Sequence, residues 1–130
     1  MSRRRWGDPL AKNPGRRQAR INDLLRRAIG DILLFRFSED LKAMTTVTEI
    51  RTSSDLRHAR VYVAVLGDKD VQADTINILQ QKRGEIRDYL AREVVLKYLP
   101  SVEFLIDESA EKAARIEELL NRNQDRSDEA

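Results

Sequence analysis

Residues 45–65 have the sequence TTVTEIRTSSDLRHARVYVAV, and this stretch decides the fold. Its first part, 45–52, is rich in β-branched residues, which favours a strand. Its last part, 59–65, alternates valine with other residues, as in a strand with one buried face. The Ser53-Ser54-Asp55 sequence between them is typical of a turn in which Asp55 binds backbone groups rather than acting as an acid or base. The stretch therefore predicts a β-hairpin.

The segment before the hairpin predicts an amphipathic helix that ends near Phe37, before the polar residues 38–40. Its apolar residues recur at three- and four-residue spacing, which is the period of one helix face. They are Ile21, Leu24, Leu25, Ala28, Ile29, Ile32 and Phe35. Gly30 lies within this helix at a cost of about 1 kcal/mol relative to alanine, and we expect it to permit close packing against another element.

The segment after the hairpin predicts helical structure over 71–98, followed by a third strand. Apolar residues at helical spacing are interrupted by Gly84, so the segment is either one kinked helix or two short ones. Pro100 ends the helical structure and favours an extended conformation of the residue before it. Residues 102–106 then alternate as a strand does.

A last helix is expected at the C-terminal end of this region. Asp107 or Ser109 can cap it. Its buried stripe would consist of Ala113, Ile116 and Leu120.

These elements predict one α+β domain in which helices cover a three-stranded sheet. The order is helix, strand, strand, helix, helix, strand, with the C-terminal helix appended. We expect the domain to span 16–121, between a disordered basic arm over 1–15 and a polar tail over 122–130.

Composition excludes most enzyme classes. The chain has 130 residues, no cysteine and one histidine, His58, so thiolate or histidine metal clusters and Ser-His relays are excluded. The paired carboxylates Glu117 and Glu118 point about 100° apart on a helix and do not converge. We therefore predict no catalytic residue, no metal and no cofactor. No apolar run is long enough to span a membrane, and we expect a soluble, cytoplasmic protein that does not act on a membrane or on a small-molecule substrate.

Charge is distributed unevenly along the chain although the formal net charge is only +2. Residues 1–27 hold nine Lys/Arg and two acidic residues, whereas residues 103–130 hold four and nine. A basic end of this kind favours a polyanion such as RNA, whose phosphates dominate affinity. The acidic end would face away from RNA or toward a basic protein.

Local motifs in the same order and spacing resemble the ribosome-binding factor A family from about residue 16 to residue 120. The matching pieces are VTEI at 47–50, SSDLRHARVYV at 53–63, GEIR at 84–87, PSVEF at 100–104 and DES at 107–109. The resemblance implies a type II KH-like fold and an assembly factor that binds 16S rRNA and the immature small ribosomal subunit and assists its late maturation and rRNA processing. We expect a monomer, since nothing in the sequence demands a dimer. It also implies that Lys82-Arg83-Gly84 occupies the kink between two helices, where the family has a small residue, another residue and a glycine.

The residues that we expect to contact RNA belong to the arm, the first helix and this kink. They are Arg3, Arg4, Arg5, Arg16, Arg17, Arg20, Arg27, Lys82, Arg83, Gly84 and Arg87. For the arm, the alternative is a tail that only adds solubility. For the first helix, it is a face exposed to solvent, and for the kink it is local ion pairing. We expect Gly84 to shape the kink, either by adopting a positive φ angle or by allowing two helices to approach closely. The alternative function is a protein-interaction module that docks on a basic ribosomal protein through the acidic C-terminal half, without direct RNA readout.

Overall fold

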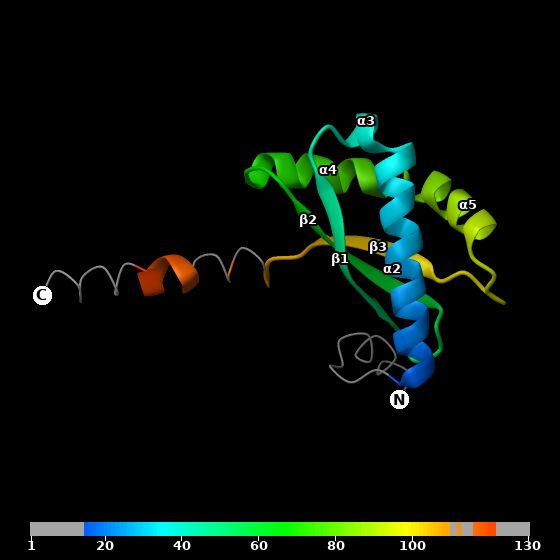
Figure 1. The fold of residues 1–130 in the computed structure, drawn as a ribbon. Helices are drawn as coiled ribbons and strands as arrows, with labels where there is room; N and C mark the ends of the chain where they lie inside the picture. The colour runs from blue at the N-terminus through cyan, green and yellow to red at the C-terminus, as the bar shows by residue number, and fades with distance from the viewer. Residues whose placement is uncertain (1–14, 110–111, 113–115, 122–130) are drawn as a thin grey trace, which may run out of the picture.

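The computed structural model describes residues 15–109, 112 and 116–121. Its elements are α2 (Arg16–Arg36), α3 (Ser38–Leu41), β1 (Thr45–Thr52), β2 (His58–Val65), α4 (Lys69–Gln81), α5 (Arg83–Glu93) and β3 (Ser101–Ile106). Figure 1 shows α2 running along the sheet, with α4 and α5 at its upper end. The expected α+β class and element order are confirmed.

The three strands form one sheet in the order β1-β2-β3. β1 and β2 pair antiparallel, which confirms the hairpin, and Ile50 lies opposite Val61. β2 and β3 pair parallel, with Val61 opposite Phe104. A parallel pair needs a crossover connection, and α4 with α5 supplies it. The register shifts between Val47 and Glu49, which is a bulge in β1.

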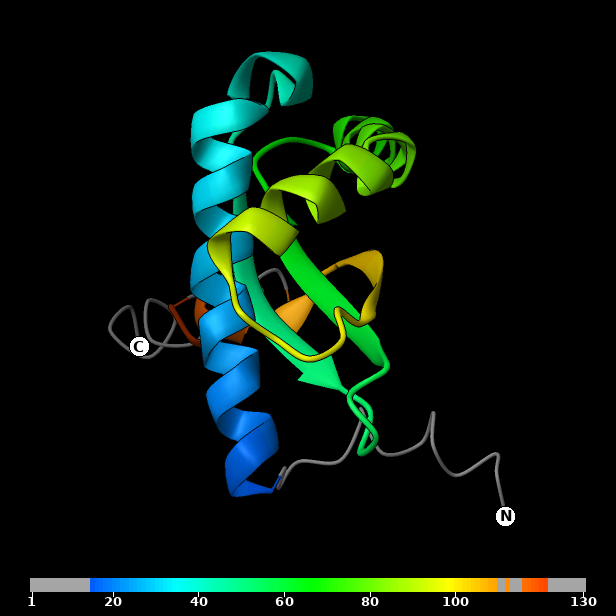
Figure 2. The same ribbon diagram turned by 90° about the vertical axis from the view of Figure 1, so that its right-hand side faces the viewer.

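The core lies between the sheet and the helices. The expected alternation in β2 is confirmed, because Val61 and Val63 are fully buried while Arg60 and Tyr62 are half-buried on the other face. Figure 2 shows α2 on one side of this core and α4 with α5 above it. Full burial of each large aliphatic side chain contributes about 1.5–3 kcal/mol. The helices supply Leu25, Ile29, Ile32, Leu33, Leu79, Ile86 and Leu90.

Two boundaries differ from the expected ones. The short helix α3 occupies the segment expected to be a polar break, and it buries Leu41. Helical structure ends at Glu93 rather than at residue 98. Val94 is extended there (φ −123°, ψ 146°) and 6% exposed. The chain therefore leaves the helix at Val94 and buries this side chain in the core.

The helices α4 and α5 are two separate helices, and their junction lies at Lys82. Lys82 ends α4 and precedes α5 with φ −88° and ψ 3°. Gly84 lies inside α5 without a positive φ, and a Cβ built on it would meet no atom within 4 Å. The expectation that Gly84 provides a positive φ or a close helix approach is therefore wrong. A Cβ built on Gly30 would also meet no atom within 4 Å, so the close packing expected at Gly30 is wrong as well.

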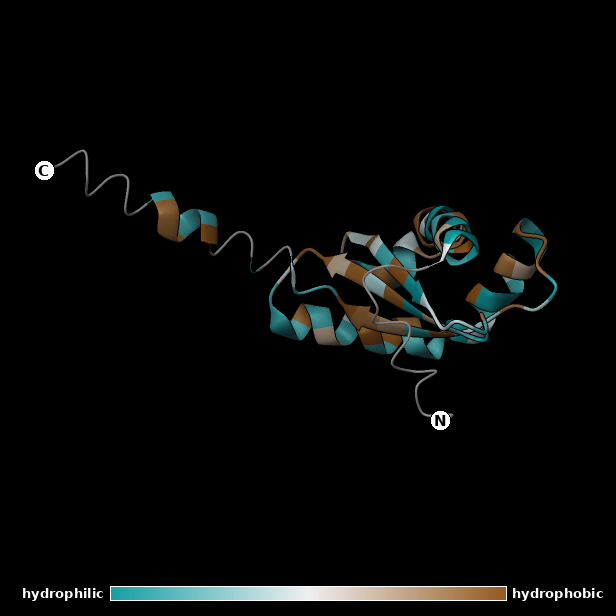
Figure 3. Ribbon diagram, turned by 90° about the horizontal axis from the view of Figure 1, so that it is seen from below, coloured by the Kyte–Doolittle hydropathy of each residue, from teal (hydrophilic) through white to brown (hydrophobic). Residues whose placement is uncertain are grey.

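The C-terminal stripe is exposed rather than buried. Ile116 and Leu120 are 58% and 60% exposed, so the burial expected for them is wrong, and Ala113 lies outside the described residues. Figure 3 shows the apolar positions of this segment away from the sheet. The described apolar residues of this segment repeat at helical spacing, but they do not pack on the sheet or on the helices that cover it. In the part of the chain that the structure describes, no helix is both long and apolar enough to cross a bilayer.

Candidate nucleic-acid interface

Hydrogen bonds fix the N-terminal half of α2 beside the end of β1. The Gln18 side-chain amide donates to the carbonyl of Thr52 at 2.9 Å, and the Thr52 hydroxyl donates to Oδ1 of Asn22 at 2.8 Å. The exposed arginines of the first two helical turns, Arg16, Arg17 and Arg20, are thereby held beside the hairpin turn.

The hairpin turn over residues 53–57 is fixed by its own polar groups. The buried Ser53 hydroxyl donates to Oδ1 of Asp55 at 2.6 Å, and the Arg57 backbone N–H donates to the same oxygen at 3.1 Å. These two hydrogen bonds, the Ser53 bond first, lower the pKa of Asp55. Leu56 has a positive φ of 61° within the turn. The expected turn role of Asp55 is confirmed.

The loop that follows α5 lies against this turn. The backbone N–H of Ser101 donates to the carbonyl of Arg57 at 2.8 Å. On the other side of the loop, the guanidinium of Arg87 donates to the carbonyl of Leu99 at 3.3 Å. Side chains from α2, the turn, the loop and α5 are therefore brought to one end of the molecule.

A hollow of about 330 Å³ lies where α2, the turn and the loop meet. Three cations line it, Arg17 from α2, Arg57 from the turn and Lys97 from the loop. Ile21 and Leu56 contribute apolar surface to the same hollow. We call it the basic hollow.

The cations of α5 extend this surface. Arg87 and Lys97 line a neighbouring hollow of about 450 Å³. Arg83 lines a third hollow, of about 630 Å³, together with His58 and Arg60 at the start of β2. The first two hollows share Lys97, and the third begins at His58, the residue after Arg57. One carboxylate lines each hollow, Asp55, Asp88 and Glu103 respectively. We call the five cations Arg17, Arg57, Lys97, Arg87 and Arg83 the basic band.

The remaining expected contact residues lie apart from the basic band or in local pairs. Arg27 and Arg26 both bind the carboxylate of Asp23, with the Arg26 contact at 2.9 Å. These hydrogen bonds, the Arg27 bond first, lower the pKa of Asp23, and the Asp23 bond raises the pKa of Arg27. Lys82 is half-buried and lies 3.7 Å from Glu85. A phosphate would have to compete with these carboxylates.

The three arginines of the arm, Arg3, Arg4 and Arg5, lie outside the described residues. Arg16 and Arg20 are exposed on α2 but do not line the basic hollow, and Gly84 is an exposed helical residue of α5.

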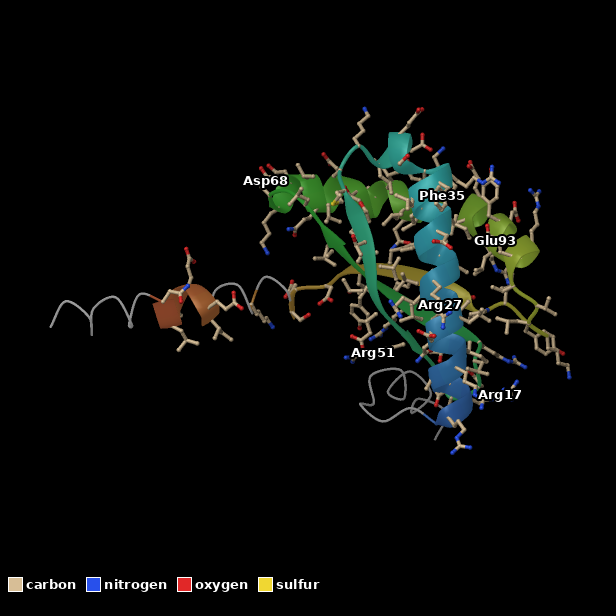
Figure 4. The ribbon with its side chains drawn as sticks, viewed as in Figure 1. Arg17, Arg27, Phe35, Arg51, Asp68 and Glu93 are labelled. Atoms are coloured by element: carbon tan, nitrogen blue, oxygen red, sulfur yellow. The ribbon has the colours of Figure 1, made fainter. Side chains whose placement is uncertain are left out.

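Carboxylates lie at the opposite end of the molecule. α3 contains Glu39 and Asp40, and the start of α4 contains Asp68 and Asp70. Figure 4 shows Asp68 and Arg17 at opposite corners of the molecule. These four carboxylates, with Lys42 and Lys69 beside them, therefore lie at the end of the folded domain opposite Arg17.

Sequence reasoning missed Arg57 and Lys97. Each is an isolated cation in a turn or loop and belongs to no periodic pattern. Arg57 lies within one of the segments that resemble the family, and this was the signal that could have found it. Lys97 had no such signal, because only the contact between Ser101 and Arg57 brings its loop to the turn.

Nothing in the described residues resembles a metal centre, since no three of their His, Asp and Glu side chains gather to hold an ion. The chemistry that the basic band offers is the binding of anions by guanidinium and ammonium groups, next to apolar and aromatic surface.

Comparisons with known proteins agree on one family. A sequence model of the family described as ribosome-binding factor A matches residues 17–120. The ribosome-binding factor A of Opitutus terrae is 40% identical over 105 residues, which are 81% of this chain and 85% of that protein. The crystal structure of ribosome-binding factor A from Thermus thermophilus is similar with a TM-score of 0.62 and 25% identity, over 71% of this chain and 97% of that one. A model of the Thermus thermophilus protein fitted into the cryo-electron-microscopy map of a 30S complex is similar with a TM-score of 0.56 and 25% identity, over 67% of this chain and 91% of that one.

Proposed function

The chain belongs to the ribosome-binding factor A family, and we propose that it binds the 16S rRNA of the small (30S) ribosomal subunit through the basic band and assists late maturation of that subunit. The relative fitted into a 30S complex supports the choice of partner. The fold is the KH-like one of this family.

One observation carries the proposal of direct RNA binding. Arg17, Arg57, Lys97 and Arg87 come from four separate segments and gather at one end of the domain, where they outnumber Asp55 and Asp88, the carboxylates that line the same hollows. A local excess of cations attracts a polyanion to that end. Since phosphates dominate protein affinity for nucleic acids, the basic band is the surface best suited to RNA.

The mode of recognition follows from the residues at the helix junction. Many KH domains clamp the RNA backbone with a Gly-x-x-Gly loop, which the junction at 82–84 lacks. Recognition at this junction then rests on phosphate contacts and on the shape of the RNA.

The test is a salt-titrated binding assay of the full chain with naked 16S rRNA. The triple variant Arg17→Ala, Arg57→Ala and Lys97→Ala removes three exposed cations of the basic band. We expect weaker binding and a log–log salt slope that is smaller by about 0.7 for each phosphate that the variant no longer binds. The control is Lys69→Ala, an exposed cation between two carboxylates at the acidic end, which should bind as the wild type does.

The alternative function predicts a different outcome. A protein-interaction module would bind intact small subunits but not naked 16S rRNA, and removal of residues 107–130 would abolish that binding. Equal affinity and equal salt slope for the triple variant and the wild type would exclude the basic band as the RNA surface.

The role in maturation has its own test in cells. We expect cells depleted of the protein to accumulate free small subunits that contain unprocessed rRNA, most severely in the cold. Gradient sedimentation at low temperature, with mapping of the rRNA ends, measures this. A normal subunit profile with mature ends would contradict the assembly role and leave RNA binding to be judged by the assay above.

A further inference from the structure

We propose that the basic hollow is a pocket for one unpaired nucleotide of RNA, with a preference for guanine. The proposal rests on the proposed RNA-binding function and specifies what one part of that surface recognises.

The basic hollow has the size and rigidity of a preformed site. Its volume of about 330 Å³ lies near the lower end of small-molecule pockets, which span roughly 300–1,000 Å³. Two backbone hydrogen bonds hold its walls, from Ser101 N–H to the Arg57 carbonyl at 2.8 Å and from Leu56 N–H to the Ser53 carbonyl at 2.9 Å. A ligand therefore does not have to order the turn or the end of the loop when it binds.

The hollow offers flat apolar surface to a base. Tyr98 lines it and is 68% exposed, so its ring is accessible from solvent. The ammonium of Lys97 lies 5.6 Å from the centroid of that ring. Leu96 and Pro100 add apolar surface on the same wall. Stacking on an aromatic ring is the usual way in which proteins hold an unpaired base.

The hollow also offers cations to the phosphate that such a base carries. Arg17 and Arg57 line it from opposite segments, the helix and the turn. A guanidinium forms paired hydrogen bonds with phosphate oxygens. The lining of the hollow is partly apolar and partly cationic. A nucleotide fits both parts if its base lies against the loop and its phosphate lies near these two arginines.

Asp55 supplies the base preference. Its carboxylate lines the same hollow and is held by hydrogen bonds that both end on Oδ1, from Ser53 and from the Arg57 N–H. An ionised carboxylate only accepts hydrogen bonds. The Watson–Crick edge of guanine presents two adjacent donors, whereas that of uracil presents one donor between two acceptors. A carboxylate therefore favours guanine and disfavours uracil.

The experiment uses the full chain and four hairpin RNAs that differ at one position in an otherwise paired stem. That position carries a bulged guanine, a bulged inosine, a bulged uracil or no bulge. Inosine lacks the exocyclic amino group of guanine and so tests one hydrogen bond. Dissociation constants are measured at one salt concentration. For the wild type we expect the guanine bulge to bind about 10-fold more tightly than the fully paired stem, with inosine and then uracil weaker than guanine.

Two variants separate the contributions. Tyr98→Leu should remove the preference for any bulged RNA. Asp55→Asn keeps Oδ1 as an acceptor within the turn and should make guanine and inosine bind equally. The control is Phe35→Leu, since Phe35 is an aromatic residue, 74% exposed, near the other end of α2, where Figure 4 labels it. Thermal unfolding of each variant verifies that it is folded.

The possible failures are distinguishable. If the wild type binds all four RNAs with equal, salt-dependent affinity, the pocket proposal is overturned and the proposed RNA-binding function stands. If Tyr98→Leu keeps the full preference for the guanine bulge, the base is recognised elsewhere and the pocket proposal is again overturned. If the wild type binds none of the RNAs, naked 16S rRNA included, the proposed function fails and the pocket fails with it.

Discussion

The hydroxyl of Thr52 donates a hydrogen bond to Oδ1 of Asn22 at 2.8 Å, which joins the last residue of β1 to the second turn of α2. Thr52 is 2% exposed, so its hydroxyl has little access to water as a substitute partner. Because Arg17 lies little more than one turn before Asn22, this contact positions Arg17 over the basic hollow.

Loss of this hydrogen bond should destabilise the domain. Thr52→Val preserves the shape of the side chain but leaves the part-buried Asn22 oxygen without its donor, so we expect a loss of about 1 kcal/mol in the free energy of unfolding. Urea unfolding measures it. Combining Thr52→Val with Asn22→Ala should cost less than the two single changes together, since both remove the same contact. Strictly additive costs would contradict the coupling.

Removal of the arm should weaken binding without unfolding the domain. Deletion of residues 1–14 takes away Arg3, Arg4 and Arg5 but keeps Gly15, whose backbone N–H donates to the Gln18 side chain at the start of α2. We expect reduced affinity for 16S rRNA at moderate salt and an unchanged melting temperature. Thermal unfolding and salt-titrated binding check the two parts. A large drop in melting temperature would mean that the arm belongs to the folded domain.

Two glycines should respond in opposite ways to alanine. Gly84 is helical with open space around it, so Gly84→Ala should stabilise the protein by about 0.5–1 kcal/mol. Gly67 has φ 144° and a Cβ there would lie 2.7 Å from a methyl carbon of Val71, so Gly67→Ala should destabilise by about 1–3 kcal/mol. Urea unfolding compares them. The Gly84 variant also tests whether RNA approaches the backbone there, because a Cβ would then lower RNA affinity while stability rises.

Acid should destabilise the protein through Asp55. Hydrogen bonds from Ser53 and the Arg57 N–H lower the pKa of Asp55 from its ordinary value of 3.8. A lowered folded-state pKa stabilises the fold above the unfolded value, and this contribution is lost as pH falls through the folded value. We therefore expect the stability difference between the wild type and Asp55→Asn to be constant from pH 7 to pH 5 and to shrink below about pH 4. Urea unfolding across this range measures it. A difference that grows in acid would contradict the sign.

Periodicity in the sequence was sufficient for the elements that bury one continuous face. The alternation in β2 corresponds to burial, and so do Leu25, Ala28, Ile29 and Ile32 of the stripe predicted for α2. Leu24 and Phe35 of that stripe are 41% and 74% exposed, so the predicted stripe is wider than the buried face. It was insufficient at Val94, where an apolar residue at helical spacing is extended because the core accepts it in that conformation. It was misleading at Ile116 and Leu120, whose stripe has no partner surface among the described residues. Local spacing reports which residues share a face, but not whether another element covers that face.

The site was less predictable than the fold. Arg17, Arg83 and Arg87 were recognised as cations on helices, but the basic band also includes Arg57 and Lys97. These come from segments far apart in the sequence, and parallel pairing of β2 with β3 brings them together. No pattern within one segment carries such a tertiary contact.

The same parallel pairing has a kinetic consequence. The hairpin of β1 and β2 closes through the short turn at 53–57, whereas pairing of β3 with β2 must close the long crossover over 66–100. Closing a short loop costs less entropy than closing a long one, so local pairing precedes distant pairing. Pulse-labelled hydrogen exchange during refolding should therefore protect the amides of β1 and β2 before those of β3. The basic hollow, whose third wall follows α5, would then be among the last features of the protein to appear, and a nascent chain could place a nucleotide in it only at the end of folding.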